Sequence, residues 1–120
     1  MLNRIDIMGR LVREPEYRTT TKGTAVATFT LAVDRDFNRE ETDFVDCIAW
    51  SGTADFVSKY FHKGSMAVVS GRLQSDKWTD KDDKKHTSWN VRVDNVYFGE
   101  SKKSESPKLV EMDDGEEIPF

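Results

Sequence analysis

Two large aromatic residues, Phe44 and Trp50, stand an even number of positions apart in a segment that reads as a β-strand. Even spacing places both side chains on one face of a strand, while the small residues Val45, Cys47 and Ala49 point to the other face. An aromatic side chain on a sheet surface can stack against a nucleobase, because every base has a π-face. The same spacing is also typical of a sheet with a second hydrophobic layer. On this strand alone, both interpretations stay open.

A third aromatic residue, Phe37, lies at the centre of the charged segment 35–41. A loop of this composition has little core to enter. An exposed Phe here favours a binding role over the alternative, which is a lid folded across the end of the fold.

The composition bounds the class of protein. A chain of 120 residues accommodates one domain, and with 33% charged residues and no long apolar run it predicts neither a membrane span nor a signal peptide. Cys47 is the single cysteine, which excludes an internal disulfide and a cysteine-based zinc site and suits a reducing cytoplasm. His62 has no partner at metal-binding or catalytic spacing. We therefore expect no catalytic residue, no metal and no cofactor.

The acidic excess is confined to the end of the sequence. Residues 99–120 contain seven acidic and three basic residues, so they account for the whole net charge of −4 and leave residues 1–98 balanced. A balanced domain is compatible with nucleic-acid binding, since the placement of charge matters more than its sum. Residues 99–112 are too polar to pack, and we expect a flexible linker there. The linker would join a domain over 1–98 to an acidic tip over 113–120.

The acidic tip also carries apolar residues, which a simple solubilising tail does not need. Its members are Asp113, Asp114, Glu116, Glu117, Ile118, Pro119 and Phe120. A basic-rimmed pocket on another protein could take the Phe ring and a carboxylate. We interpret the segment as a protein-interaction tip; the alternative is a plain acidic tail that repels DNA.

Five segments have the alternating pattern of strands, and they cover residues 2–12, 24–34, 42–50, 65–77 and 86–98. Between the third and fourth, apolar residues recur at helical spacing over 53–63, with Thr53 as the expected N-cap. Gly9 and Gly71 stand in mid-strand, where a closed barrel needs bends. This order predicts an all-β OB-fold, a five-stranded Greek-key barrel with one short helix between strands three and four.

Two further expectations follow from strand alternation. Trp89 shares parity with Val91 and Val93, and we expect it to pack in the core. Alternation also predicts an outward position for Val26, Met66 and Val68. The surface that they would form is more apolar than a solvated face needs, which favours self-association.

Four sequence segments, taken in order, carry a family resemblance. They are LNRIDIMGRL followed by EPE within 2–16, GTAVATFTLA at 23–32, KGS, GRL and WTD within 63–80, and DDGEEIPF at 113–120. Through them nearly the whole chain resembles the bacterial and phage single-stranded DNA-binding proteins. The resemblance implies sequence-independent binding of single-stranded DNA, a homotetramer in the bacterial cytoplasm, and replication, recombination and repair proteins as partners of the tip. The short linker suggests a phage, plasmid or accessory form.

The resemblance also implies which residues stack on bases. The family's stacking positions fall on Phe37, Phe44, Trp50 and Trp78. Relatives often have Trp where Phe37 and Phe44 stand, and Asp46 lies where a basic or neutral residue would suit a phosphate better. Our candidates for phosphate contacts, each of which could equally be solvated surface, are Arg4, Arg10, Arg35, Arg39, Arg72 and Lys77.

Two other functions remain as alternatives. An RNA-binding or protein-interaction barrel would have the same aromatic pattern, because stacking is indifferent to the sugar. A small nuclease would need clustered carboxylates for a metal. Asp34, Asp36 and Asp46 could be proposed for that role, but no motif supports them.

Overall fold

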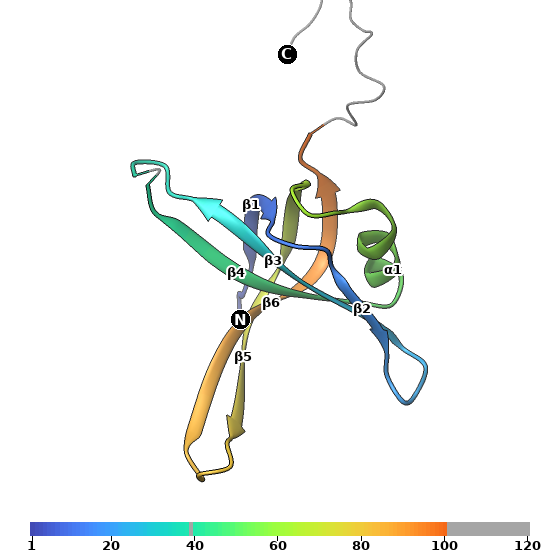
Figure 1. Ribbon diagram of the computed structural model, residues 1–120, viewed down its shortest axis with the longest axis vertical. Helices are drawn as coiled ribbons and strands as arrows, with labels where there is room; N and C mark the ends of the chain where they lie inside the picture. The colour runs from blue at the N-terminus through green and yellow to red at the C-terminus, as the bar shows by residue number, and fades with distance from the viewer. Residues whose placement is uncertain (39, 101–120) are drawn as a thin grey trace, which may run out of the picture.

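Six strands and one helix follow one another in the computed structural model, which describes residues 1–38 and 40–100 (Figure 1). They are β1 (Ile5–Leu11), β2 (Glu16–Thr19), β3 (Ala25–Asp34), β4 (Thr42–Trp50), α1 (Ser51–Tyr60), β5 (Met66–Thr79) and β6 (Lys85–Phe98). The helix stands between the third and fourth long strands, as the sequence predicts.

The strands form one closed sheet. Their order is β1-β5-β6-β4-β3-β2, and β1 also pairs with β3, which closes the ring. All pairings are antiparallel except β4 with β6, which run parallel and meet only at Cys47↔Val91 and Ile48↔Arg92. This architecture confirms the predicted OB-fold.

The sheet has one more strand than expected, because β1 and β2 share a partner. Leu11 in β1 pairs with Leu31, and Glu16 in β2 pairs with Thr28, so both strands lie along β3. Pro15 stands in the gap between them, and proline has no backbone N–H to give to a ladder. β1 lies within the predicted first strand over 2–12, whereas β2 lies beyond it and was not predicted.

The core lies inside this ring and under α1. Its largest fully buried side chains are Phe61, Leu11, Leu31, Val57, Val69, Val91 and Cys47. Gly9 and Gly71 allow close approach of the strands, as expected. A Cβ at Gly9 would lie 2.6 Å from the Ala32 carbonyl oxygen, and one at Gly71 would collide with the Arg92 carbonyl oxygen beside a register shift in the β5–β6 ladder.

The helix begins earlier than predicted. Trp50, in extended conformation, is its N-cap and no side chain makes a capping hydrogen bond, so the expected cap at Thr53 is wrong. The chain passes directly from the end of β4 into the first turn. Asp55 instead accepts a 2.7 Å hydrogen bond from the Tyr17 hydroxyl, which ties α1 to β2.

Hairpins extend beyond the barrel at β3–β4 and at β5–β6 (Figure 1). We call residues 74–90 of the second hairpin the long arm. Trp89 lies on this arm and is 60% exposed, so its expected place in the core is wrong. Its parity does match that of buried Val91, but the strand continues past the end of the barrel, where no core remains to receive the ring.

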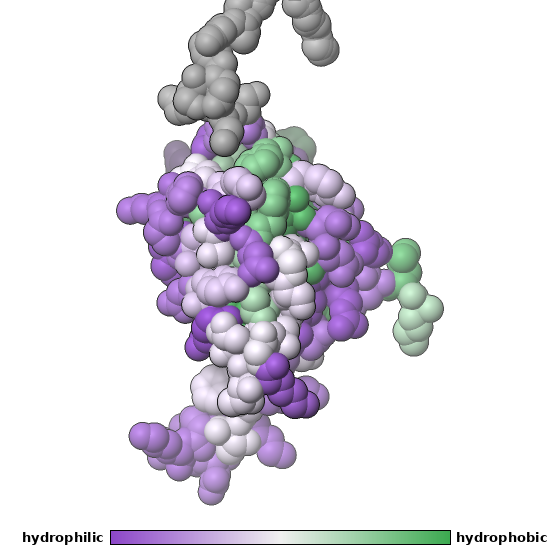
Figure 2. Space-filling model, turned by 90° about the vertical axis from the view of Figure 1, so that its right-hand side faces the viewer, coloured by the Kyte–Doolittle hydropathy of each residue, from purple (hydrophilic) through white to green (hydrophobic). Residues whose placement is uncertain are grey.

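Exposed apolar groups gather in two places. Met8, Val68 and Tyr97 are neighbours in one row across β1, β5 and β6, and Met8 and Tyr97 are exposed. Val26 is buried, so the expectation that it faces solvent is wrong. Figure 2 shows a hydrophobic patch on the side that carries α1. In α1, the centroid of the Phe56 ring lies 5.3 Å from that of Tyr60 and 5.6 Å from that of Phe98.

Candidate nucleic-acid interface

Strand register places three of the four predicted stacking residues on one face. Phe44 and Trp50 share parity with Ile48 in β4, and the alternate residues of that strand point into the core. Ile48 pairs with Arg92 in β6, and Arg92 pairs with Arg72 in β5. Directly paired residues project to the same side of a sheet.

The same face continues along β5 to the last tryptophan of that strand. Counting by twos from Arg72 reaches Trp78, and the ladder between them has no register shift. We call this surface the outer face and define it by Phe44, Trp50, Arg72, Trp78 and Arg92. The sequence prediction had linked Trp78 to the others only through the family resemblance; the pairing supplies a geometric link.

All four predicted stacking residues are open to solvent. The exposed fraction is 102% for Phe37, 67% for Phe44, 39% for Trp50 and 51% for Trp78. Phe37 lies at the end of the β3–β4 hairpin, between Asp34 and Thr42, and so stands apart from the outer face. The alternative of a second hydrophobic layer fails for Phe44 and Trp50, because no layer covers them in the described chain.

Neighbouring groups hold the two tryptophans in place. The Arg92 guanidinium carbon lies 5.7 Å from the centre of the Trp50 ring, which is within cation–π range. The Trp78 ring stacks on His86 at 4.3 Å and 20°, and its Nε1 donates a 3.3 Å hydrogen bond to Ser88. One ring face of Trp78 is therefore occupied, and the other is left for a ligand.

The tip of the long arm is fixed by a carboxylate. Asp80 contacts the His86 ring nitrogen at 2.7 Å and accepts hydrogen bonds from the backbone N–H groups of Asp82 and Lys84. The hydrogen bond from His86 is the main cause that lowers the pKa of Asp80, and the backbone hydrogen bonds add to it. The partner that stacks on Trp78 is thus itself anchored.

Three of the six predicted phosphate contacts are engaged in ion pairs. Arg4 pairs with Asp94 at 2.9 Å, Arg10 with Glu100 at 2.9 Å, and Arg35 with Glu41 at 2.9 Å. Arg35 also forms two hydrogen bonds to Asp43, which lower the pKa of that carboxyl. These cations would have to exchange partners before they could hold a phosphate.

The other phosphate candidates differ in their surroundings. Arg72 and Lys77 are exposed and form no ion pair within residues 1–38 and 40–100. Arg39 lies outside the described residues, as do the linker residues 101–112 and the tip residues 113–120.

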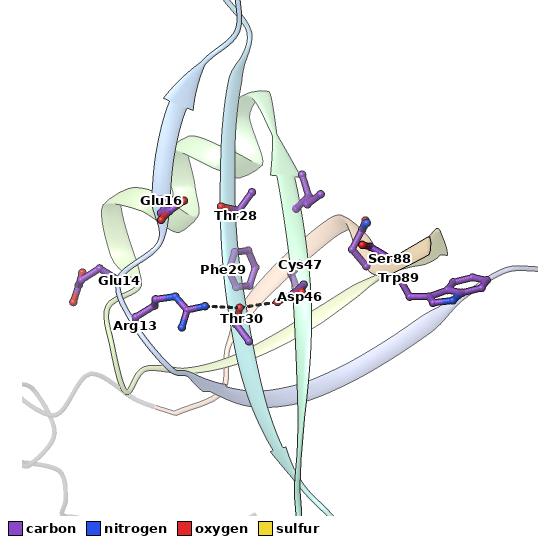
Figure 3. A pocket seen from close by; sticks show the side chains of 12 residues that line it. Arg13, Glu14, Glu16, Thr28, Phe29, Thr30, Asp46, Cys47, Ser88 and Trp89 are labelled. Carbon is purple, nitrogen blue, oxygen red and sulfur yellow. Dashed lines mark hydrogen bonds between the residues drawn. The ribbon is translucent and has the colours of Figure 1, made fainter. Parts of the chain in front are cut away.

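A cleft of about 300 Å³ opens beside the outer face, where β4 and β6 diverge (Figure 3). On its floor, Arg13 donates a 3.5 Å hydrogen bond to the Thr30 hydroxyl, which donates at 2.8 Å to Asp46. Asp46, which the sequence analysis found unfavourable for a phosphate, is therefore already engaged within the fold. Glu14 and Glu16 also line the cleft, so its lining is not that of an anion site.

Within residues 1–38 and 40–100, the carboxylates offer no site for metal chemistry. Among the described residues there is no group of three or more His, Cys, Asp or Glu side chains that could hold a metal ion. The nuclease alternative built on Asp34, Asp36 and Asp46 thus lacks its metal site in this part of the chain. None of the described helices has the length and apolar character needed to cross a membrane.

Arg92 lies on the outer face but was missed as a candidate site residue in the sequence. Its role depends on pairing with Ile48 in β4, a parallel contact between strands far apart in sequence. The basic side chain opposite Arg72 could have been found only by assuming the β5–β6 register.

Comparisons with known proteins identify the family of the chain. The model of the single-strand binding protein family matches residues 2–99. The chain is 44% identical over 109 residues to single-stranded DNA-binding protein 1 of Staphylococcus aureus (strain COL), which covers 88% of this chain and 65% of that protein. It is 42% identical over 106 residues to single-stranded DNA-binding protein A of Bacillus subtilis (strain 168), covering 85% of this chain and 62% of that protein. The chain thus spans somewhat less than two thirds of these relatives.

Proposed function

Because the chain belongs to the single-strand binding protein family, we propose that it binds and protects single-stranded DNA without regard to sequence. The observation that carries this proposal is the alignment of Phe44, Trp50 and Trp78 on one exposed face by strand register. Successive bases would stack on these rings, with Phe37 adding a contact from the hairpin end.

The mechanism needs no covalent step, in keeping with a family of DNA-binding proteins rather than enzymes. Each stacked base contributes about 1–3 kcal/mol by this mode and does so for any base. Duplex DNA hides its base faces and should bind poorly. The protein would coat transient single strands and prevent their re-annealing during replication, recombination and repair.

Tryptophan fluorescence tests the proposal directly. We expect oligo-dT to quench the emission strongly, less so at high salt, and a duplex of equal length to leave it unchanged. Absence of quenching together with absence of a retained complex would refute the proposal and favour a protein-interaction barrel. Competition with an RNA oligomer of matched sequence distinguishes DNA binding from the RNA-binding alternative, because an RNA-binding protein would release the DNA in favour of the RNA.

We also propose that the chain self-associates, with a tetramer expected from the family resemblance. The supporting surface is the row formed by Met8, Val68 and Tyr97, which presents apolar groups to solvent across three strands. Sedimentation at micromolar concentration should show an oligomer, and Met8→Glu should lower its mass. A wild-type monomer would contradict self-association.

The tip at 113–120 is proposed to recruit replication and repair proteins, although it lies outside the described residues. Its massed acid and the apolar residues Ile118–Phe120 suit a basic-rimmed pocket. Deleting residues 118–120 should abolish capture of partner proteins and leave oligo-dT affinity unchanged. An unchanged set of captured proteins would contradict the docking role.

A further inference from the structure

Two arginines face each other across the β5–β6 ladder. Arg72 and Arg92 are direct cross-strand partners on the outer face. Like charges in this arrangement are destabilising, so the pair lowers the stability of the sheet unless an anion lies between them. Arg72 has no ion-pair partner in the described chain, as noted above.

The Arg92 guanidinium is only weakly held. Its nearest acid is Asp76, with a separation of 3.7 Å between an Arg92 terminal nitrogen and a carboxylate oxygen. Its Nε is buried without a hydrogen-bond partner within the described residues. The side chain is 26% exposed and lies against the Trp50 ring. The terminal nitrogens of Arg92 are therefore only loosely engaged, and they lie beside a predicted base-stacking residue.

Asp76 is bound more firmly elsewhere. Its other carboxylate oxygen accepts a 2.7 Å hydrogen bond from the Asn90 side-chain amide, and Asn90 is buried. A short bond to a buried group fixes the carboxylate, whereas the 3.7 Å contact to Arg92 is too long for a hydrogen bond. Asp76 can thus release Arg92 without losing its own anchor.

From these contacts we infer that Arg72 and Arg92 together bind one backbone phosphate of the single strand. The phosphate would lie between a base stacked on Trp50 and the bases that continue toward Trp78. Asp76 competes for Arg92 in the free protein, and the phosphate displaces it. This inference rests on the proposed DNA-binding function and adds Arg92 and Asp76 to its site.

Salt dependence of binding provides the test. Binding of fluorescently labelled oligo-dT is followed by anisotropy across a salt series, so the readout does not depend on Trp50 emission. Each phosphate contact on a single strand contributes about 0.7 to the slope of log K against log salt. The double variant Arg72→Gln/Arg92→Gln should reduce the slope by about 0.7, because both arginines share one phosphate.

Two further variants sharpen the result. Asp76→Asn should tighten binding, since the amide oxygen can still accept from Asn90 but no longer attracts Arg92. Arg92→Lys should retain the slope, and thermal melts confirm folding of each variant. The double variant Lys22→Gln/Lys59→Gln removes two positive charges, in the turn between β2 and β3 and on α1, so it is the charge-matched control and should leave the slope unchanged.

Each other outcome overturns the inference. A slope unchanged in the double variant would mean that neither arginine contacts phosphate, and a slope reduced by about 1.4 would mean two separate phosphates. Unchanged or weaker DNA binding by Asp76→Asn would show that Asp76 does not compete with the phosphate for Arg92. Failure of the proposed function is distinguishable, because the wild-type protein would then show no binding at any salt concentration.

Discussion

Two tryptophans on opposite faces of one arm give a sharp test of the DNA path. Trp78 pairs with His86 and Trp89 pairs with Ser75, and their parities in the β5–β6 ladder are opposite. They are exposed to similar degrees, 51% and 60%. Trp78→Ala and Trp89→Ala therefore remove the same group from the same arm, but only Trp78 belongs to the outer face.

The expected loss for Trp78→Ala follows from its contacts. His86 covers one ring face, so the free face can stack a single base. Loss of one stacked base costs about 1–3 kcal/mol, which corresponds to a rise in Kd of about five- to 150-fold. Trp89→Ala should change Kd by less than about twofold, because the Trp89 ring lies on the face of the arm opposite to the outer face, where the DNA is proposed to bind.

The measurement is a titration of labelled oligo-dT at fixed salt with wild type and both variants. Equal weakening by the two substitutions would show that DNA passes over both faces of the arm, through the cleft that Trp89 helps to line. No weakening by Trp78→Ala would refute stacking on the arm altogether. Thermal melts of each variant check that the fold is retained.

Other predictions concern stability and reactivity. Gly9→Ala should destabilise the fold by about 1–3 kcal/mol in urea titrations, because its Cβ would lie 2.6 Å from a carbonyl oxygen of β3; Gly52→Ala, with nothing within 4 Å, should not. Burial raises the pKa of Cys47 to about 12, so a thiol reagent at pH 8 should modify it only after unfolding, and rapid modification of the native protein would contradict burial. The hydrogen bond from His86 lowers the pKa of Asp80 below its ordinary 3.8, so this stabilisation is complete above that pH and lost as the pH falls below it. Thermal melts between pH 7 and pH 3 should show a smaller acid-induced loss in Asp80→Asn than in wild type.

Strand alternation predicted most of the fold because the barrel is built from regular two-residue periods. The faces of the 42–50 strand followed directly from its pattern, with Cys47 and Ala49 buried and Phe44 and Trp50 exposed. The mid-strand glycines also fell where strands approach closely. Local chemistry was sufficient wherever neighbours in sequence decide the environment.

Alternation failed where the environment depends on distant segments. Trp89 has the parity of a core residue, but parity says nothing about how far the barrel extends along the strand. Arg92 gained its place beside Trp50 through a parallel pairing of only two residues on each strand. The prediction of an N-cap at Thr53 is wrong because β4 continues directly into the helix. The hydrogen bond from Tyr17 to Asp55 joins β2 to α1, two elements that are distant in sequence.

The closure of the ring has a consequence for the order of folding during synthesis. β1 emerges first from the ribosome, yet most of its ladder is with β5, from Ile5↔Gly71 to Arg10↔Met66. The seam between β4 and β6 forms later still, at Val91 and Arg92. Pairings between such distant segments form slowly, because the loop between them must close first. A nascent chain arrested before residue 91 would hold its β3–β4 hairpin but no closed barrel, so we expect protease resistance to appear only once β6 has been released.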